Sequence, residues 1–259
     1  LRVRRAWPLV DACQHHVRGL NLRVSNPAAD FAPDLQRVLS DWKGGGKTET
    51  PAKRSTVASP NDTKKRDRIH CDNTDHALRL WSSATPVVGS PVERYLESRS
   101  ITLMPPRTLR FRAHLRHHSG LYLPAMIALV TNAVSGKPTA IHRTYLTRDG
   151  SGKADVSPNK MMLGPTRGGV ACLGEADDAV MIGEGIETCL SVMQAMGMPV
   201  WAALSASGMR AIELPDQMTR VTILADSDEA GLRAADVAAR RWTREGRRVR
   251  IARAPEGMD

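Results

Sequence analysis

Four short apolar runs, separated by segments of helical character, occupy the last third of the chain. The runs are AVMI (179–182), VWAAL (200–204), VTILA (221–225) and VRIA (249–252). The segments between them are predicted as helices over Glu187–Met196, Met209–Ile212 and Ala230–Glu245, and Gly197 and Gly246 follow the first and the last. Nearly continuous apolar strands that alternate with helices predict a parallel sheet with helices on both faces, so we expect an α/β fold here.

Carboxylates follow two of these predicted strands. Glu184 and Gly185 come after the first strand, and Asp226 and Asp228 come after the third. The carboxyl ends of parallel strands lie at one edge of a sheet, so we expect these carboxylates to converge. Two like charges about 4 Å apart repel by roughly 4 kcal/mol at an effective dielectric constant near 20. A divalent cation relieves that repulsion, and oxygen ligands suit Mg²⁺ or Mn²⁺ better than zinc, so Glu184, Asp226 and Asp228 are predicted as metal ligands.

The same residues allow other interpretations. Asp228 also has the position of an N-cap for the helix that follows it. The run GEGIET at 183–188 is half of a dinucleotide-binding fingerprint, but Thr188 replaces the third glycine and Glu184 would repel a pyrophosphate. Gly185 is expected to let the backbone approach a phosphate, and Gly231 is expected to permit close packing of a helix on a strand.

Residues 76–170 are predicted to form a smaller, basic α+β domain, and 171–259 a second domain. Helices are expected over 76–83 and from Pro91 through Arg99, with Ser90 as the N-cap of the second helix. Two strands are expected on either side of the Ser-Gly pair at 135–136. A loop rich in glycine and proline follows them and carries Arg148, Lys153, Lys160 and Arg167.

Residues 1–75 are predicted to be an N-terminal segment and linker that is poorly ordered. The stretch 43–75 is polar, charged and rich in turn formers, which is typical of a linker. It contains GGGKT at 44–48, but Asp41 stands where a phosphate-binding loop needs its first glycine, and Pro51 falls where a helix would follow. The segment is therefore not interpreted as a nucleoside-triphosphatase motif.

The charge is divided unevenly along the chain. The formal net charge of +10 is made up of +14 over residues 1–170 and −4 over residues 171–259. This division suits a protein that holds a polyanion and gathers cations at one place, and two ordinary solvated surfaces would give the same count. Aromatic residues make up only 4% of the chain, which argues against base stacking as the main mode of nucleic-acid binding.

Cysteine spacing and hydropathy exclude several further classes. The four cysteines form no CxxC pair, so neither a disulfide framework nor a zinc ribbon is expected. We interpret His114, His117 and His118 as part of a basic segment rather than a metal site. No apolar run approaches the roughly 18 residues of a membrane span, and the first residues lack a secretion signal, so we expect no membrane partner and a cytoplasmic location.

The segment from about 179 to 257 resembles a Toprim domain, the catalytic fold of DnaG-type primases, topoisomerases and OLD-type nucleases. The family signature is a glutamate in an EG turn after the first strand and an Asp-x-Asp after the third. Glu184-Gly185 and Asp226-Ser227-Asp228 match it in order. The runs GEGIET, WAALSASGM and LADSDEAG are similar to the Toprim branch of plasmid- and phage-type primases or primase–helicases. The preceding runs YLESRSI, PAMIALV, HRTYL and NKMMLGPTRGG are also similar, so the resemblance covers roughly 91–257.

Some positions depart from the family pattern. DnaG-type enzymes have an aspartate four residues after the signature glutamate, whereas this chain has Thr188 there and Glu187 one residue earlier. No cysteine pattern for the zinc-binding module of such primases is present. The family continues past PEGMD with further acidic residues and a helix, so a fragment or a truncated gene product is one expectation.

The resemblance implies a Rossmann-like parallel sheet flanked by helices and a Mg²⁺- or Mn²⁺-dependent primase. Such an enzyme makes RNA primers from nucleoside triphosphates on a single-stranded DNA template in plasmid or phage replication, with a replicative helicase as a further partner. Glu184, Asp226 and Asp228 would then be catalytic. The residues expected to contact nucleotide or DNA are Arg143, Lys160, Arg167 and Gly185. A metal-dependent nuclease with the same carboxylates, and a truncated non-catalytic DNA-binding remnant, remain open alternatives.

Overall fold

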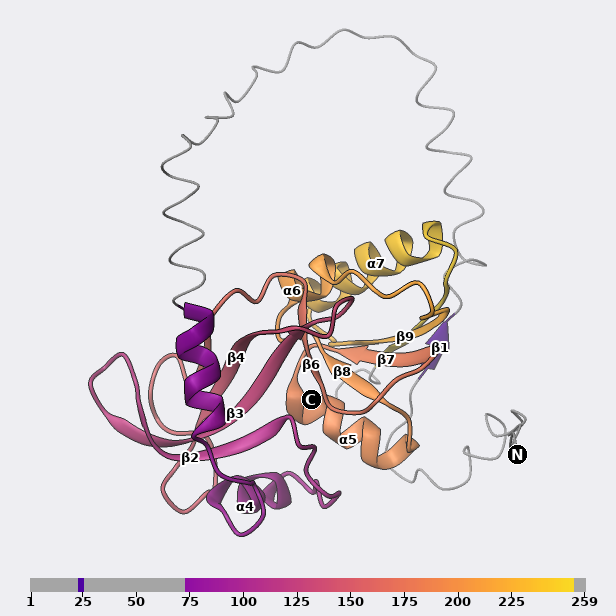
Figure 1. Cartoon of the computed structure of the whole chain (residues 1–259). Helices are drawn as coiled ribbons and strands as arrows, with labels where there is room; N and C mark the ends of the chain where they lie inside the picture. Colours follow the sequence, from indigo (N-terminus) through magenta and orange to yellow (C-terminus); the bar gives the residue numbers. More distant parts are fainter. Residues whose placement is uncertain (1–22, 26–72, 254–259) are drawn as a thin grey trace, which may run out of the picture.

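The computed structural model describes residues 23–25 and 73–253, and its central feature is a ten-stranded sheet (Figure 1). The strands lie in the order β1-β10-β9-β7-β8-β6-β3-β4-β5, and β2 pairs with β3 outside this path. Their bounds are β1 (Arg23–Ser25), β2 (Leu109–Arg116), β3 (Tyr122–Asn132), β4 (Pro138–Tyr145), β5 (Lys160–Leu163), β6 (Gly169–Cys172), β7 (Ala179–Gly183), β8 (Val200–Ala202), β9 (Arg220–Ala225) and β10 (Arg248–Arg253). The helices are α4 (Pro91–Ser98), α5 (Ile186–Met196), α6 (Ala206–Ala211) and α7 (Glu229–Arg244), with a further helical segment at residues 73–82.

The four strands predicted from the apolar runs are present and parallel. β10 pairs with β9, β9 with β7, and β7 with β8, all in the parallel sense. Their central side chains are buried because helices cover both faces of the sheet, as in Ile182 and Ile223 at 0% exposure. The predicted α/β fold is therefore confirmed.

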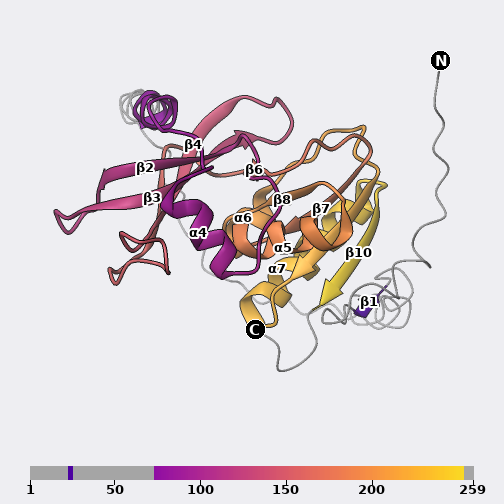
Figure 2. The ribbon, with the colours of Figure 1, turned by 90° about the horizontal axis from the view of Figure 1, so that it is seen from below.

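The helices divide between the two faces of this sheet. α5 packs on one face together with α4, where Tyr95 and Leu96 share a core with Leu190 (Figure 2). α6 and α7 cover the opposite face, where Ile212 and Trp242 belong to a second core (Figure 1). The sheet thus lies between two layers of helices, with a hydrophobic core on each face.

Local sequence explains where these helices begin and end. The Ser90 side chain accepts a hydrogen bond from the N–H of Val92 at the start of α4, and Pro91 occupies the first turn. α5 ends at Gly197, which adopts the left-handed conformation with φ of +61°. These two boundaries were predicted from the sequence, to within one residue.

The preceding part of the chain contains more strand than the sequence predicted. β3 and β4 form the expected hairpin, and Gly136 in its turn has φ of +66°. β2, however, covers residues 109–116, for which no strand was predicted. β5 and β6 lie within and beside the predicted loop, so Lys160 stands on a strand rather than in a loop. The first helical segment begins at residue 73 instead of 76.

One sheet joins the two predicted domains. β6 pairs with β3 through Thr131 and Val170, and with β8 through Ala171 and Ala202. The core that contains α4 and α5 also draws on both predicted domains. The boundary at 170/171 remains a prediction, but the hydrogen-bonded ladder runs across it.

Some predictions concern residues that lie outside the described part of the chain. They include the GGGKT segment and the linker at 43–75, apart from residues 73–75.

β1 was not predicted, and it pairs antiparallel with β10 at the edge of the sheet (Figure 2). No helix within residues 73–253 is long and apolar enough to cross a membrane.

Candidate functional site

The signature carboxylates lie at the ends of two neighbouring strands. Glu184 directly follows β7, and Asp226 directly follows β9. The two strands are parallel partners, with Ile182 opposite Ile223, so Glu184 and Asp226 leave the same edge of the sheet. The convergence that we expected from residues more than forty positions apart therefore has its basis in the pairing of β7 with β9.

Helix N-termini engage two of the three carboxylates. The backbone N–H of Ala206, at the start of α6, acts to lower the pKa of Glu184. Asp228 is the N-cap of α7, and its Oδ1 accepts a hydrogen bond of 2.6 Å from the N–H of Gly231. The capping role considered for Asp228 is therefore present, and it fixes that carboxylate beside Asp226.

The surroundings of Glu184 and Asp226 disfavour the ionisation of both carboxyl groups. Burial raises the pKa of Glu184, and the nearby charges of Asp226 and Asp228 raise it further. Burial also raises the pKa of Asp226, with Asp228 as the second cause. Lys160 opposes both shifts. A concentration of negative charge that the protein itself neutralises incompletely is suited to a cation.

The fit to a divalent metal rests on donor chemistry. Carboxylate oxygens are the ligands that Mg²⁺ and Mn²⁺ prefer, and the mutual repulsion is what such an ion would relieve. Among the residues described, no three His, Cys, Asp or Glu side chains lie close enough together to hold a metal ion as they stand. An ion would therefore have to draw Glu184, Asp226 and Asp228 closer than they lie, and their role as ligands remains a prediction.

A cavity of about 260 Å³ opens beside these carboxylates. Its acidic side is formed by Glu184 and Asp226, and its basic side by Arg99, His142, Lys153 and Lys160. The remaining lining residues come from the start of α5 and from the turn after β8, and they are Gly185, Ile186, Glu187, Thr188 and Leu204. Leu204 has φ of +69°, unusual for a residue other than glycine, and its N–H donates to the Glu184 carbonyl at 2.9 Å. Acidic and basic side chains thus line the same cavity.

Glu187 anchors the basic side, a role that the sequence did not predict. Its carboxylate is buried, and Oε1 accepts a hydrogen bond of 2.7 Å from the Tyr95 hydroxyl. Lys153 Nζ lies 3.5 Å from Oε1, and Lys160 Nζ lies 3.5 Å from Oε2. Although burial opposes ionisation, Lys160, Tyr95 and Lys153 together lower the pKa of Glu187 to about 2. The sequence signal for this role was that Glu187 falls on the face of α5 that is buried, where a charged residue needs partners.

The segment that carries both lysines is tied down by His117. Nε2 of its ring lies 3.1 Å from the Pro158 carbonyl, an acceptor, so Nε2 carries the hydrogen. Nδ1 accepts from the N–H of Ser119 at 3.2 Å. His117, from the basic segment with His114 and His118, therefore holds the chain two residues before Lys160, a structural role that was not predicted.

The other predicted contact residues have different places. Arg143 donates to the Met162 carbonyl at 2.9 Å and to the Tyr145 hydroxyl at 3.4 Å, and it does not line the cavity. Arg167 is exposed in the turn between β5 and β6, also outside the cavity lining. Gly185 does line the cavity and is the N-cap of α5, with an ordinary φ of −86°. The structure therefore brings together Lys160 and Gly185 with the carboxylates, but neither arginine.

Gly231 lies too close to the carboxylates to accept a side chain. A Cβ placed there would stand 2.9 Å from Asp226 Cβ and 3.1 Å from Asp228 Oδ1. Gly231→Ala is expected to push Asp226 aside and to weaken Mn²⁺ binding about tenfold, although alanine normally favours a helix by about 1 kcal/mol. Isothermal titration with Mn²⁺ measures the affinity. Gly152→Ala, where a Cβ meets nothing within 4 Å, is the matched control and is expected to bind as the parent does.

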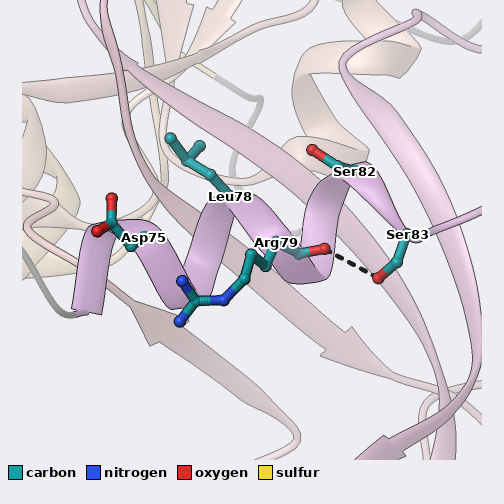
Figure 3. Close-up of a pocket in the computed structure, with 5 residues that line it drawn as sticks. All are labelled: Asp75, Leu78, Arg79, Ser82 and Ser83. Atoms are coloured by element: carbon teal, nitrogen blue, oxygen red, sulfur yellow. Dashed lines mark hydrogen bonds between the residues drawn. The ribbon is translucent and has the colours of Figure 1, made fainter.

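A second hollow lies along the first helical segment, away from these residues (Figure 3). It measures about 540 Å³ and is lined by Asp75, Leu78, Arg79, Ser82 and Ser83. The Ser83 hydroxyl donates to the Arg79 carbonyl at 2.9 Å, which closes the end of the helix. No cluster of facing charges is present there, and we assign it no function.

Comparison with known protein families divides the chain in two. Residues 179–259 match the family described as Toprim domain. Residues 71–173 match a family described as a domain of unknown function (DUF7146). No curated protein sequence matches the chain.

Three solved structures illustrate the likeness in fold. The primase fragment of the bacteriophage T7 primase-helicase protein aligns at 15% identity with a TM-score of 0.41, covering 65% of this chain and 64% of that fragment. A DNA primase domain from Pseudomonas aeruginosa aligns at 16% identity with a TM-score of 0.47, covering 72% of each chain. The zinc-binding and RNA polymerase domains of Aquifex aeolicus primase align at 16% identity with a TM-score of 0.49, covering 90% of this chain and 63% of that one. The chain thus spans less than two thirds of the T7 and Aquifex structures.

Proposed function

Because residues 179–259 are a Toprim domain, as the sequence resemblance predicted, we propose that this protein is a primase-like nucleotidyltransferase. It would use Mg²⁺ or Mn²⁺ to join nucleoside triphosphates into RNA primers on a single-stranded DNA template. Plasmid or phage replication is the setting that the sequence resemblance implies, and a replicative helicase is the partner that it implies.

The observation that carries this proposal is the pairing of opposite charges across one cavity. A metal-bound nucleoside triphosphate presents a cation on one side and phosphate oxygens on the other. Glu184 and Asp226 would face the cation, and Lys153 and Lys160 would face the phosphates. Such an arrangement serves phosphoryl transfer, in which positioning and charge stabilisation account for most of the catalysis.

The residues of the chain would divide the chemistry between them. Bound metal would supply charge neutralisation at the transferring phosphoryl group. In the reaction, a 3′-hydroxyl oxygen forms a bond to the α-phosphorus of the next nucleotide, the bond to the β-phosphate breaks, and pyrophosphate leaves. Glu184 would take the proton of that hydroxyl. Lys160 would hold the phosphates in line with the attack.

The template would be held outside the cavity by contacts to its phosphates. The chain has no Asp or Glu between Glu97 and Asp149, so this stretch is entirely basic in its charged residues. Arg167 is exposed and would add to that surface, whereas Arg143 would act through its contacts to β5. Binding that depends on phosphate contacts falls steeply as salt is raised and shows little sequence preference.

A direct assay tests the proposal. We expect that incubation with single-stranded DNA, Mg²⁺ and labelled ribonucleotides gives new oligonucleotides several residues long, and that chelation of the metal abolishes them. Shortened DNA instead of new oligonucleotides would assign the site to a nuclease. DNA binding without either product, unchanged by Asp226→Ala and Asp228→Ala, would identify a non-catalytic DNA-binding remnant.

A further inference from the structure

The imidazole of His142 occupies the basic side of the cavity without a hydrogen-bond partner for one of its nitrogens. His142 lies on β4, opposite Ala128 of β3 and Met162 of β5, and is only 5% exposed. Its Nδ1 is buried and unpaired, and among the described residues it is the one such atom that belongs to a residue lining this cavity. Buried polar atoms in folded proteins are nearly always paired, and because His142 lines the cavity, a ligand bound there would supply the missing partner.

The surroundings of the ring favour an anion as that partner. The positive charges of Lys160, Arg143 and Lys153 act on the imidazole, and the negative charge of Glu187 opposes them. Both oxygens of Glu187 are already engaged, Oε1 by Tyr95 and Lys153 and Oε2 by Lys160. Arg99 adds a further cation to the same side of the cavity. An anionic group of the ligand therefore meets more positive charge there than the protein neutralises by itself.

We propose that His142 is a ligand contact, donating a hydrogen bond from its ring to a phosphate oxygen of the nucleoside triphosphate that Lys153 and Lys160 also face. This assignment rests on the proposed function and names a residue that recognises the phosphate chain. Glu187 pairs with both lysines, and His142 lines the same cavity as they do, so all three side chains would offer donors to a ligand bound there. A neutral ring has one N–H, and the tautomer that binds carries its hydrogen on the nitrogen that faces the phosphate.

The test uses inorganic triphosphate with Mg²⁺ as the probe and isothermal titration as the measurement. His142→Leu keeps a similar volume and removes both nitrogens, and it is expected to weaken triphosphate binding about tenfold. His142→Asn keeps a polar group near the position of Nδ1 and is expected to recover part of that loss. Thr144→Val is the matched control, because Thr144 is fully buried two residues further along β4 and its unpaired hydroxyl lies outside the cavity. Thermal unfolding of each variant confirms that it is folded.

The outcomes separate this inference from the function on which it rests. A loss in His142→Leu with unchanged binding in Thr144→Val supports the contact. Equal binding in His142→Leu and the parent overturns it, as does an equal loss in Thr144→Val, which would reflect packing of the strand. If triphosphate binds in a manner that depends on His142 and yet no oligonucleotide is made, the contact stands and the primase proposal fails. If His142→Leu makes primers with an unchanged KM for nucleotides, the contact fails and the primase proposal stands.

Discussion

Asp226→Asn is expected to lower the rate of nucleotide incorporation about a thousandfold, because it removes a charge that would hold the metal and leaves the shape of the site intact. Glu184→Gln should have an effect of the same order. Both variants are expected to unfold at a temperature no lower than that of the parent, since each substitution relieves repulsion between half-buried or exposed carboxylates that lie close together. Single-turnover incorporation assays and differential scanning calorimetry measure the two effects.

The control for these substitutions is Glu229→Gln. Glu229 is an acidic residue in the first turn of α7, only a few positions from Asp226, but it is exposed and pairs with Arg233. Its loss should leave the rate of nucleotide incorporation within about twofold of the parent, as expected for an exposed ion pair.

The affinity for Mn²⁺ tests the metal site by a second measurement. Because the pKa values of Glu184 and Asp226 are raised, protons compete with Mn²⁺ at a higher pH than they would for ordinary carboxylates, so Mn²⁺ affinity should fall as the pH is lowered. Unchanged Mn²⁺ affinity in Asp226→Asn would contradict the metal site.

Glu187→Gln is expected to lower the free energy of unfolding at neutral pH by about 3 kcal/mol. The pKa of Glu187 is held near 2 in the folded chain, against an ordinary value of 4.5, and each unit corresponds to about 1.4 kcal/mol. The folded pKa is depressed, so this contribution is fully present above about pH 4.5 and is lost as the pH falls through 2. Urea unfolding at pH 7 and at pH 3 measures the difference between the parent and the variant, which should narrow at the lower pH.

Tyr95→Phe separates the hydrogen bond from the charge. It removes only the hydroxyl that donates to Glu187, and it should cost about 1–2 kcal/mol. Tyr122→Phe, at a tyrosine that is 60% exposed, is the matched control and should cost nothing measurable. If Glu187→Gln were as stable as the parent at both pH values, the two lysines would not be held by this carboxylate.

The acidic side of the cavity could be predicted from the sequence because its geometry follows from local order. Glu184 and Asp226 each come directly after an apolar run, and the parallel pairing of such runs brings their ends to one edge. No contact across the chain had to be known in advance. Two helix boundaries were also predictable from local sequence, since α4 has its cap at Ser90 and α5 its end at Gly197, whereas α6 begins at Ala206, three residues before the predicted start.

The basic side could not be predicted in the same way. Tyr95 and Glu187 meet although 92 residues separate them, and nothing in either local sequence indicates the other. Glu187 also needs Lys153 and Lys160 from beyond β4, whose place depends on a contact between His117 and Pro158. Tertiary contacts, rather than propensities, decide these features. β2 is a different case, because its sequence LRFRAHLR alternates apolar and polar residues and was therefore open to prediction as a strand.

The continuity of the ladder through β6 has a consequence for how a substrate would be received. β5, which begins at Lys160, and the strands β7 and β9, which end just before Glu184 and Asp226, belong to one hydrogen-bonded sheet. The basic and acidic residues are therefore not separated by a hinge between two domains. The backbone of the sheet therefore sets the distance between Lys160 and the carboxylates before a substrate binds, and domain closure is not needed to bring them together. If the chain were cleaved between residues 173 and 178, the two fragments would still be joined by the hydrogen bonds between β6 and β8.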